Sequence, residues 1–157
     1  MSENTLSAEN QQERLQKLSA DYVVALVDGE GYFSVSAIID KSKNYVSRRV
    51  RLVFGLDIKK VDGEILLRLQ KTFGCGAITE KNDDRPNFCD CLRYQVRNFD
   101  DVKNIIIPFF RRHPLQIKTK KESFEKFCVI ADHFEQKVHL THTGFIKVRN
   151  LAQNVHL

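Results

Sequence analysis

The chain has 157 residues, of which 42% are hydrophobic and 10% aromatic; this composition excludes a disordered chain and suffices for one domain with its own core. No apolar run approaches the roughly 20 residues that a membrane-spanning helix needs, and the polar start lacks the core of a signal peptide, so we expect an intracellular, soluble protein. The formal net charge of +5 favours a polyanionic partner, either nucleic acid or an anionic membrane surface.

The first predicted element is a helix over residues 8–18. It is mostly polar, and we expect it to pack only through Leu15 and Leu18. We assign the whole chain, 1–157, to a single domain and treat residues 1–18 as a leader outside its core.

A short apolar helix is predicted next, over residues 20–28. Ser19 offers an N-cap, and Asp21 stands in the first turn, where the helix dipole favours an anion. Nearly every side chain of the segment is apolar and it stops at a glycine, so little polar face remains, which is unusual for a surface helix.

From Tyr32 the hydrophobic period changes to two, which predicts two β-hairpins. The first joins residues 32–39 to residues 49–56, and the second joins residues 77–81 to residues 92–97 across a turn-rich loop. The inward side chains of the first hairpin are Phe33, Val35, Ala37, Ile39, Val50, Leu52, Phe54 and Leu56.

Helices are predicted between and after the hairpins. The order is α-β-β-α-β-β-α-α, which predicts an α+β fold with an antiparallel four-stranded sheet and helices on one face. The helical segments are residues 57–73, with Val61, Ile65, Leu66 and Leu69 inward and Gly74 and Gly76 at the end; residues 100–107, stopped by Pro108; residues 119–136, with Phe124, Phe127, Cys128, Ala131 and Phe134 inward; and residues 141–153.

The opposite face of the predicted sheet is polar and basic. Its assignable outward positions include five Lys or Arg and no Asp or Glu, whereas an ordinary solvated face mixes both signs. Arg and Gln can contact guanine and adenine through two hydrogen bonds, and a two-stranded ribbon fits the major groove of DNA. We therefore favour nucleic-acid binding over the alternative of an ordinary solvated face. The predicted DNA-binding residues are Ser34, Ser36, Ile38, Lys41, Lys43, Arg49, Arg51, Thr79, Lys81, Arg93, Gln95 and Arg97.

The cysteines do not predict a zinc site. Cys89 and Cys91 are separated by one residue, whereas a zinc ribbon needs two or more, and no second pair follows. Without a secretion signal we expect the thiols to be free.

Residues 23–31 read VVALVDGEG, and this segment resembles the signature of the LAGLIDADG homing endonucleases. Residues 26–31 occupy the positions of the LIDADG half, Ala25 stands at the first glycine, and Val23 and Val24 stand at the opening Leu-Ala. The resemblance covers roughly residues 19–136 and leaves the leader outside.

The resemblance implies a two-fold homodimer in which the motif helices of two subunits pair. Ala25 and Gly29 lie four residues apart on one helix face, where small side chains let two helix backbones approach closely. The chain has a single copy of the motif, so the partner helix comes from another subunit. Asp28 has a structural role at the helix end and the dimer interface.

The resemblance also implies the catalytic residues. Each helix delivers Glu30 beside the symmetry axis, where two carboxylates and the Gly29 carbonyl form an oxygen-rich site for Mg²⁺, which Mn²⁺ or Ca²⁺ could also occupy. Lys118, in the segment 114–118, lies near the scissile phosphate and stabilises developing negative charge. The alternatives are a surface carboxylate after a helix for Glu30 and a solvated lysine for Lys118.

Two positions depart from the family pattern. Val24 replaces the usual small Ala and is expected to reshape the helix pairing. Ile58 stands where many relatives have a Gln that orients water, and Asp57 and Lys59 are the candidate substitutes.

The expected function is that of an intron-encoded, site-specific homing endonuclease, a homodimer that cuts double-stranded DNA at a long pseudo-palindromic site. The first alternative is a non-cleaving DNA-binding regulator, or an RNA-splicing maturase that binds intron RNA, on the same fold. The second is an unrelated RNA-binding domain, for which only Tyr32 offers an exposed stacking aromatic.

Overall fold

The structure is a computed structural model that describes residues 15–81 and 90–155. The predicted leader helix lies largely outside these residues, as does most of the loop between the strands of the second hairpin. Its described end is irregular, so the helix prediction was wrong for residues 15–18. The Leu18 amide donates to the Thr72 hydroxyl at 2.9 Å, which holds this segment against a later helix and buries Leu18 in the core.

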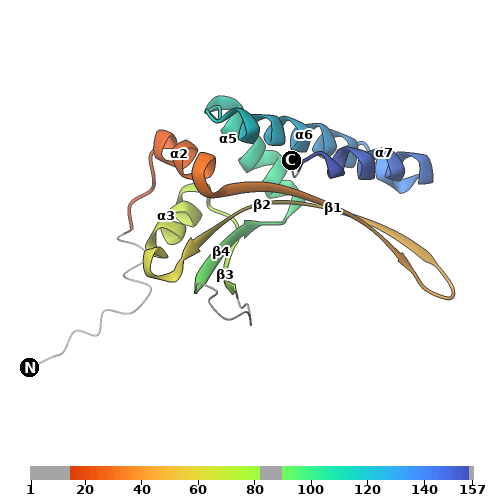
Figure 1. Cartoon of the computed structure of the whole chain (residues 1–157), viewed down its shortest axis with the longest axis horizontal. Coiled ribbons are helices and arrows are strands. Elements are labelled where there is room, and N and C mark those ends of the chain that lie inside the picture. Colours follow the sequence, from red (N-terminus) through yellow and green to blue (C-terminus); the bar gives the residue numbers. More distant parts are fainter. Residues whose placement is uncertain (1–14, 82–89, 156–157) are drawn as a thin grey trace, which may run out of the picture.

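Four antiparallel strands form one sheet in the order β1-β2-β4-β3, which confirms the predicted α+β fold. Helices lie along one face of this sheet, and the other face is a long curved surface (Figure 1). Because each strand has one buried face, the register places the apolar residues of both hairpins inward. The strands are β1 (Gly31–Lys41), β2 (Val46–Lys59), β3 (Ala77–Lys81) and β4 (Cys91–Val96).

The core lies between the sheet and the helices and is built largely from phenylalanine. The ring of Phe33 on β1 lies 5.4 Å from Phe54, 5.8 Å from Phe110, 5.2 Å from Phe124 and 5.3 Å from Phe127, measured between ring centroids. Tilted and edge-on pairs at these separations stabilise a core beyond simple area burial. The helices are α2 (Ala20–Glu30), α3 (Glu64–Phe73), α4 (Phe99–Asp101), α5 (Ile107–Arg112), α6 (Lys118–Glu135) and α7 (His142–Gln153).

Helix α2 begins where the sequence predicts and ends later. The Ser19 hydroxyl accepts a hydrogen bond from the backbone N–H of Tyr22, as an N-cap should. The helix continues through Gly29 and Glu30, and the N–H of Gly31 closes its last turn by donating to the Val27 carbonyl. Glu30 is therefore the last helical residue.

The helix predicted over residues 57–73 starts too early. Strand β2 runs to Lys59 because its last three residues pair with β4, and a 3₁₀ turn, η1 (Lys60–Asp62), precedes α3. Val61, predicted to face inward, lies on this turn and is 88% exposed.

The prediction that Pro108 stops a helix was also wrong. Helix α4, the π-helical segment η2 (Val102–Ile106) and α5 follow one another without a break, and Pro108 lies in the first turn of α5. The helix continues through Pro108 because the preceding segment is π-helical, with the Ile107 N–H donating to the Val102 carbonyl five residues back, and this wider turn accommodates the missing proline N–H. Within the described residues, no helix is both long and apolar enough to cross a membrane.

Candidate functional site

The exposed end of helix α2 carries an acidic side chain. Gly29 and Glu30 are both exposed, and no basic residue lies in the last turn of the helix. The last carbonyls of a helix lack intrahelical partners, and the helix dipole places partial negative charge there. Carboxylate, free carbonyls and dipole together attract a cation.

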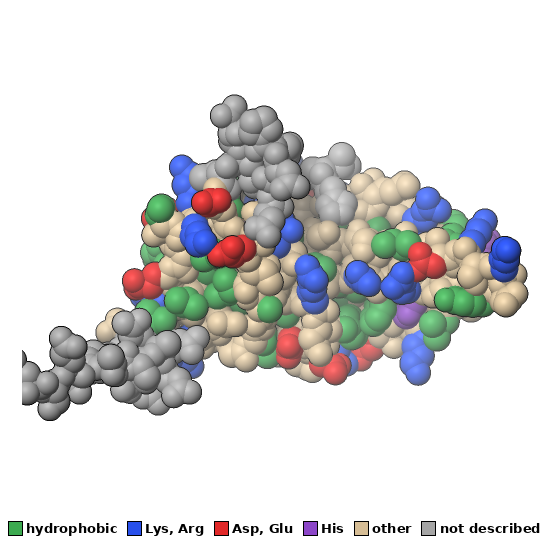
Figure 2. All heavy atoms as spheres, turned by 90° about the horizontal axis from the view of Figure 1, so that it is seen from below, with side chains coloured by type: hydrophobic (Ala, Val, Ile, Leu, Met, Phe, Trp, Pro, Cys, Tyr) green, Lys and Arg blue, Asp and Glu red, His purple; other side chains and the backbone are tan. Residues whose placement is uncertain are grey.

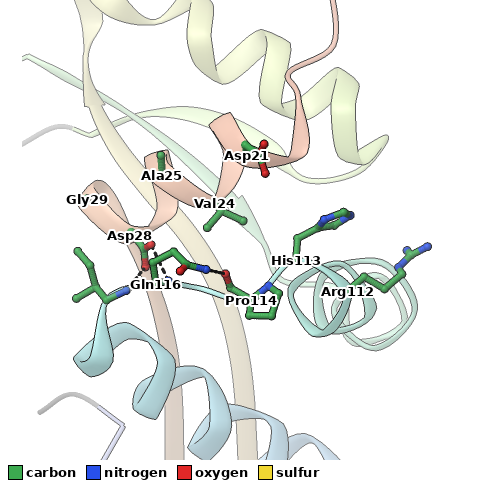
Figure 3. Close-up of a pocket in the computed structure, with 10 residues that line it drawn as sticks. Asp21, Val24, Ala25, Asp28, Gly29, Arg112, His113, Pro114 and Gln116 are labelled. Carbon is green, nitrogen blue, oxygen red and sulfur yellow. Dashed lines mark hydrogen bonds between the residues drawn. The ribbon is translucent and has the colours of Figure 1, made fainter.

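Asp28 fixes this helix end against the start of α6. Its buried carboxylate accepts hydrogen bonds from the backbone N–H groups of Gln116, at 2.9 Å, and Ile117, at 3.2 Å (Figure 3). This is the geometry of a structural acid. The sequence carries no local signal for it, since Asp28 and Gln116 lie 88 residues apart.

A second contact, which the sequence did not predict, joins the same two elements. The Lys120 ammonium donates to the carbonyl of Gly31, the residue directly after Glu30. Lys118 begins α6, and its side chain is 88% exposed, with the Glu122 carboxylate 3.9 Å away. Glu30 and Lys118 thus stand on adjoining ends of two elements tied together, although no ion pair joins them within the described residues.

Ile58 leaves its position without a polar group. It is half-buried and packs against the core, on the inner face of β2. Side chains alternate along a strand, so Asp57 and Lys59 both point to the opposite face. Neither of the two candidate substitutes can therefore replace a glutamine at position 58.

A groove of about 690 Å³ runs beside α2 (Figure 3). One wall is the helix face that carries Ala25 and Gly29, both exposed, and the other is the connection from α5 to α6, including His113. Val24, the departure from the family pattern, also lines this groove but is only 7% exposed, so the core takes up most of its side chain.

One chain supplies few ligands for a metal ion. The described residues contain no cluster of three or more His, Cys, Asp or Glu side chains. Glu30 and the adjacent carbonyls are hard oxygen donors of the kind that Mg²⁺ prefers, but a single carboxylate is only part of a site.

The open face of the sheet carries the predicted basic residues, with one addition. Asp40 and Asp57 both lie on this face, so it carries two acids in addition to the outward positions assigned from the sequence. Asp40 forms an ion pair with Arg49. Asp57 was missed because it lies at the end of β2 that the sequence pattern assigned to a helix.

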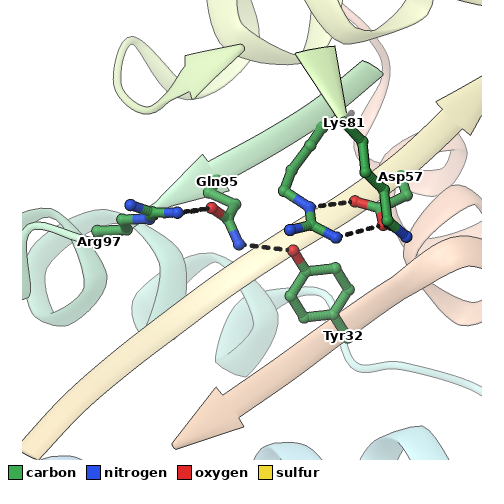
Figure 4. A network of polar contacts seen from close by, with 6 residues as sticks. Tyr32, Asp57, Lys81, Gln95 and Arg97 are labelled. Carbon is green, nitrogen blue, oxygen red and sulfur yellow. Dashed lines mark hydrogen bonds and ion pairs between the residues drawn. The ribbon is translucent and has the colours of Figure 1, made fainter. Parts of the chain in front are cut away.

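The Asp57 carboxylate is held by two cations. It accepts hydrogen bonds from Nε and Nη2 of Arg93, at 2.8 and 2.9 Å, and from Nζ of Lys81 at 2.9 Å (Figure 4). The hydrogen bonds from Arg93 lower the pKa of Asp57 below its ordinary value, against the opposing effect of burial. Asp57 is therefore a carboxylate over the whole neutral range.

A second polar chain crosses the same face. Gln95 donates from Nε2 to the Tyr32 hydroxyl at 2.8 Å and accepts from Arg97 through Oε1 (Figure 4). Burial raises the pKa of Tyr32, so this hydroxyl is neutral and keeps its proton. Lys and Arg side chains extend along the length of this face (Figure 2). The other predicted DNA-binding residues are exposed or half-buried here or at the hairpin tip: Ser34, Ser36, Ile38, Lys41, Lys43, Arg51 and Thr79.

The chain matches one family model and several solved structures. The model is described as LAGLIDADG endonuclease and matches residues 23–131. The homing endonuclease I-TnaI is 33% identical over 87% of each chain, with a TM-score of 0.75. The meganuclease I-SmaMI bound to uncleaveable DNA is 29% identical over 94% of this chain and 52% of its own, with a TM-score of 0.72. I-GzeII in complex with its DNA target is 25% identical over 86% of this chain and 43% of its own, with a TM-score of 0.72.

Proposed function

Because the chain belongs to the LAGLIDADG endonuclease family, we propose that it is a site-specific homing endonuclease that hydrolyses both strands of double-stranded DNA as a homodimer with a bound divalent cation. The observation that carries the proposal is the end of α2. There Glu30 stands exposed, and the buried Asp28 ties the helix to the start of α6, where Lys118 lies.

The curved sheet face is the proposed DNA-binding surface. It presents Arg, Lys, Ser and Thr side chains on a ribbon that fits a major groove. I-SmaMI and I-GzeII, which share the fold, have structures with DNA. A dimer of such faces would read two half-sites related by the protein's two-fold axis, hence a long pseudo-palindromic target.

The homodimer is proposed from the exposed face of helix α2. Ala25 and Gly29 form an exposed stripe of small residues on α2, and Tyr22 beside them is 51% exposed. Small residues allow a second α2 to approach closely. The chain spans about half the length of I-SmaMI.

The cation is proposed to lie between the two copies of α2. Each copy contributes the Glu30 carboxylate and the Gly29 carbonyl, so a dimer doubles the oxygen donors that a single chain offers, and Mg²⁺ suits such a site better than softer metals. When bound, the cation activates water and stabilises the oxygens that attack and leave at the phosphodiester. Lys118, the first residue of α6, has an exposed and positively charged side chain that is available to contact the phosphate.

The test compares wild type with Glu30→Gln on a library of plasmids that carry insertion-type target sites, with Mg²⁺ added. We expect equal binding of a selected target and a loss of cleavage of at least about 100-fold, more than the loss of a supporting residue around a metal causes. Glu125→Gln, an exposed acid on α6, is the matched control and should cut normally. A target bound equally by both proteins and cut by neither would refute the endonuclease and leave a DNA-binding regulator or a maturase.

A subunit-mixing experiment tests the dimer. When equal amounts of wild-type and Glu30→Gln subunits exchange freely, double-strand cleavage should fall to about a quarter, because random pairing leaves about a quarter of the dimers fully wild type. An enzyme that cuts as a monomer would retain about half of its activity in the same mixture. Glu125→Gln subunits, mixed in the same ratio, should leave cleavage unchanged.

A further inference from the structure

Arg93 on β4 and Arg97, directly after the end of β4, are each held by the same edge of the guanidinium group. Nε and Nη2 of Arg93 both donate to the Asp57 carboxylate, at 2.8 and 2.9 Å. Nε and Nη2 of Arg97 both donate to Oε1 of Gln95. In each case one edge of the planar group is occupied, and the outer edge, formed by Nη1 and the second proton of Nη2, makes no hydrogen bond within the described residues.

Neither holding residue is well placed to bind DNA itself. Asp57 is a carboxylate on a face proposed to meet phosphates, so its charge opposes binding. The Gln95 carbonyl oxygen accepts twice from Arg97 and one of its two N–H groups donates to Tyr32, so the oxygen that a free glutamine uses to read adenine is occupied (Figure 4). Asp57 and Gln95 each hold an arginine side chain in place instead.

A supported arginine reads bases better than a free one. Guanine presents two acceptors, N7 and O6, to the major groove, and an arginine edge with two N–H groups matches them. A free arginine must lose much of its side-chain freedom to make that contact. Arg93 and Arg97 have already lost that freedom, since Asp57 and Gln95 fix the plane and direction of each guanidinium group.

We propose that Arg93 and Arg97 are specificity-determining residues that each read a guanine in the target, and that Asp57 and Gln95 are positioning residues that aim them. This rests on the proposed function, since it assumes that the sheet face lies in a major groove. The two arginines are four residues apart, Arg93 within β4 and Arg97 just after its end, which is about 13 Å at the rise per residue of an extended chain. With about 3.4 Å between successive base pairs, the two guanine positions should lie about four base pairs apart in each half-site.

The test is selection of bound duplexes from a randomised pool, with the full chain and without added divalent cation, so that no cleavage occurs. Wild type should enrich guanine at two positions in each half-site. Arg93→Lys should abolish the preference at one of them and Arg97→Lys at the other, because lysine keeps the charge but cannot bridge N7 and O6. Each should weaken binding of the wild-type target by roughly 5- to 150-fold and leave binding of random duplex unchanged, because such a pair discriminates by about 1–3 kcal/mol and 1.4 kcal/mol is tenfold.

The Asp57→Asn variant separates the positioning of Arg93 from the effect of the Asp57 charge on DNA binding. Removing a negative charge should raise affinity for random duplex and steepen its salt dependence. Loss of the support should at the same time broaden the base preference at the Arg93 position and leave the Arg97 position unchanged. An equal gain in affinity for all sequences, with the guanine preference intact, would overturn the positioning role. Arg149→Lys on α7, away from this face, is the matched control.

The outcomes distinguish this inference from the proposed function. If no duplex is enriched, the sheet face does not recognise DNA and the proposed function fails with the inference. If a site is enriched but the lysine variants select the same bases as wild type, only the inference fails. Thermal unfolding of each variant shows whether it is folded, and the Arg97→Lys result stands independently if Arg93→Lys is not.

Discussion

Replacing Asp28 tests whether the end of α2 is held as the structure indicates. The carboxylate accepts two backbone hydrogen bonds, from Gln116 at 2.9 Å and from Ile117 at 3.2 Å, and it is only 7% exposed. A hydrogen bond to a charged group contributes about 1.5–3 kcal/mol. Both bonds are only partly buried, so we take the lower end and expect Asp28→Ala to lower the free energy of unfolding by about 3 kcal/mol.

Asp28→Asn should cost at least half as much, because the amide keeps one acceptor and turns an N–H group toward the second donor. For a chain of this size, 3 kcal/mol corresponds to a fall in the melting temperature of about 6–12 °C. Urea unfolding measures the loss directly, and hydrogen exchange at the amides of Gln116 and Ile117 should become faster in both variants.

Asp132→Ala, an exposed acid on α6, is the matched control and should change stability by less than about 0.5 kcal/mol. If Asp28→Ala were as stable as this control, with unchanged exchange at both amides, the hydrogen bonds would contribute nothing to stability. The conclusion that Asp28 holds α2 against the start of α6 would then be refuted.

Three further predictions concern the sheet, the glycines and the core. The hydrogen bonds from Arg93 lower the pKa of Asp57 below 3.8, so the contribution of this carboxylate to the free energy of unfolding is complete above about pH 4 and is lost as the pH falls through the lowered pKa. The difference in urea midpoint between wild type and Asp57→Asn should therefore shrink as the pH is lowered from about 6 to about 3. Gly31→Ala should lower the unfolding free energy by about 1–3 kcal/mol, because a Cβ there would lie 2.6 Å from the nearest side-chain carbon, whereas Gly29→Ala meets nothing within 4 Å and should instead weaken self-association in sedimentation equilibrium. Tyr94→Phe should cost about 1 kcal/mol in urea unfolding, because the buried hydroxyl loses its 2.8 Å hydrogen bond to the carbonyl of residue 75.

The sheet was predictable from sequence because its pattern is local. Alternation from Phe33 onward places every second side chain against the helices, and slipping the register by one residue would bury the arginines and expose the phenylalanines. The same reasoning identified Arg93, Gln95 and Arg97 as outward-facing. The partner of Arg93 was not predictable, because Asp57 lies opposite it only through the pairing of β2 with β4.

The errors have a common cause, which is tertiary structure overriding a local pattern. Residues 57–59 resemble the start of a helix, but β4 holds them in the sheet. Proline ends most helices, yet Pro108 follows a π-helical turn in which its missing N–H is tolerated. The contacts of Asp28 and Lys120 span nearly ninety residues, and no periodicity could have indicated them.

Glu30 stands at a helix position that disfavours its negative charge. A carboxylate at a helix C-terminus meets the negative end of the dipole, and α2 has no basic residue in its own last turn, although the Lys120 ammonium binds the carbonyl of the following residue, Gly31. The cost is about 0.3–1 kcal/mol, and a bound cation reverses its sign. Residues that violate a local rule are found most often at functional sites. The neighbouring Asp28 avoids the same cost by accepting two N–H groups, whereas Glu30 stands exposed at the end of the helix, where a bound cation would stabilise it.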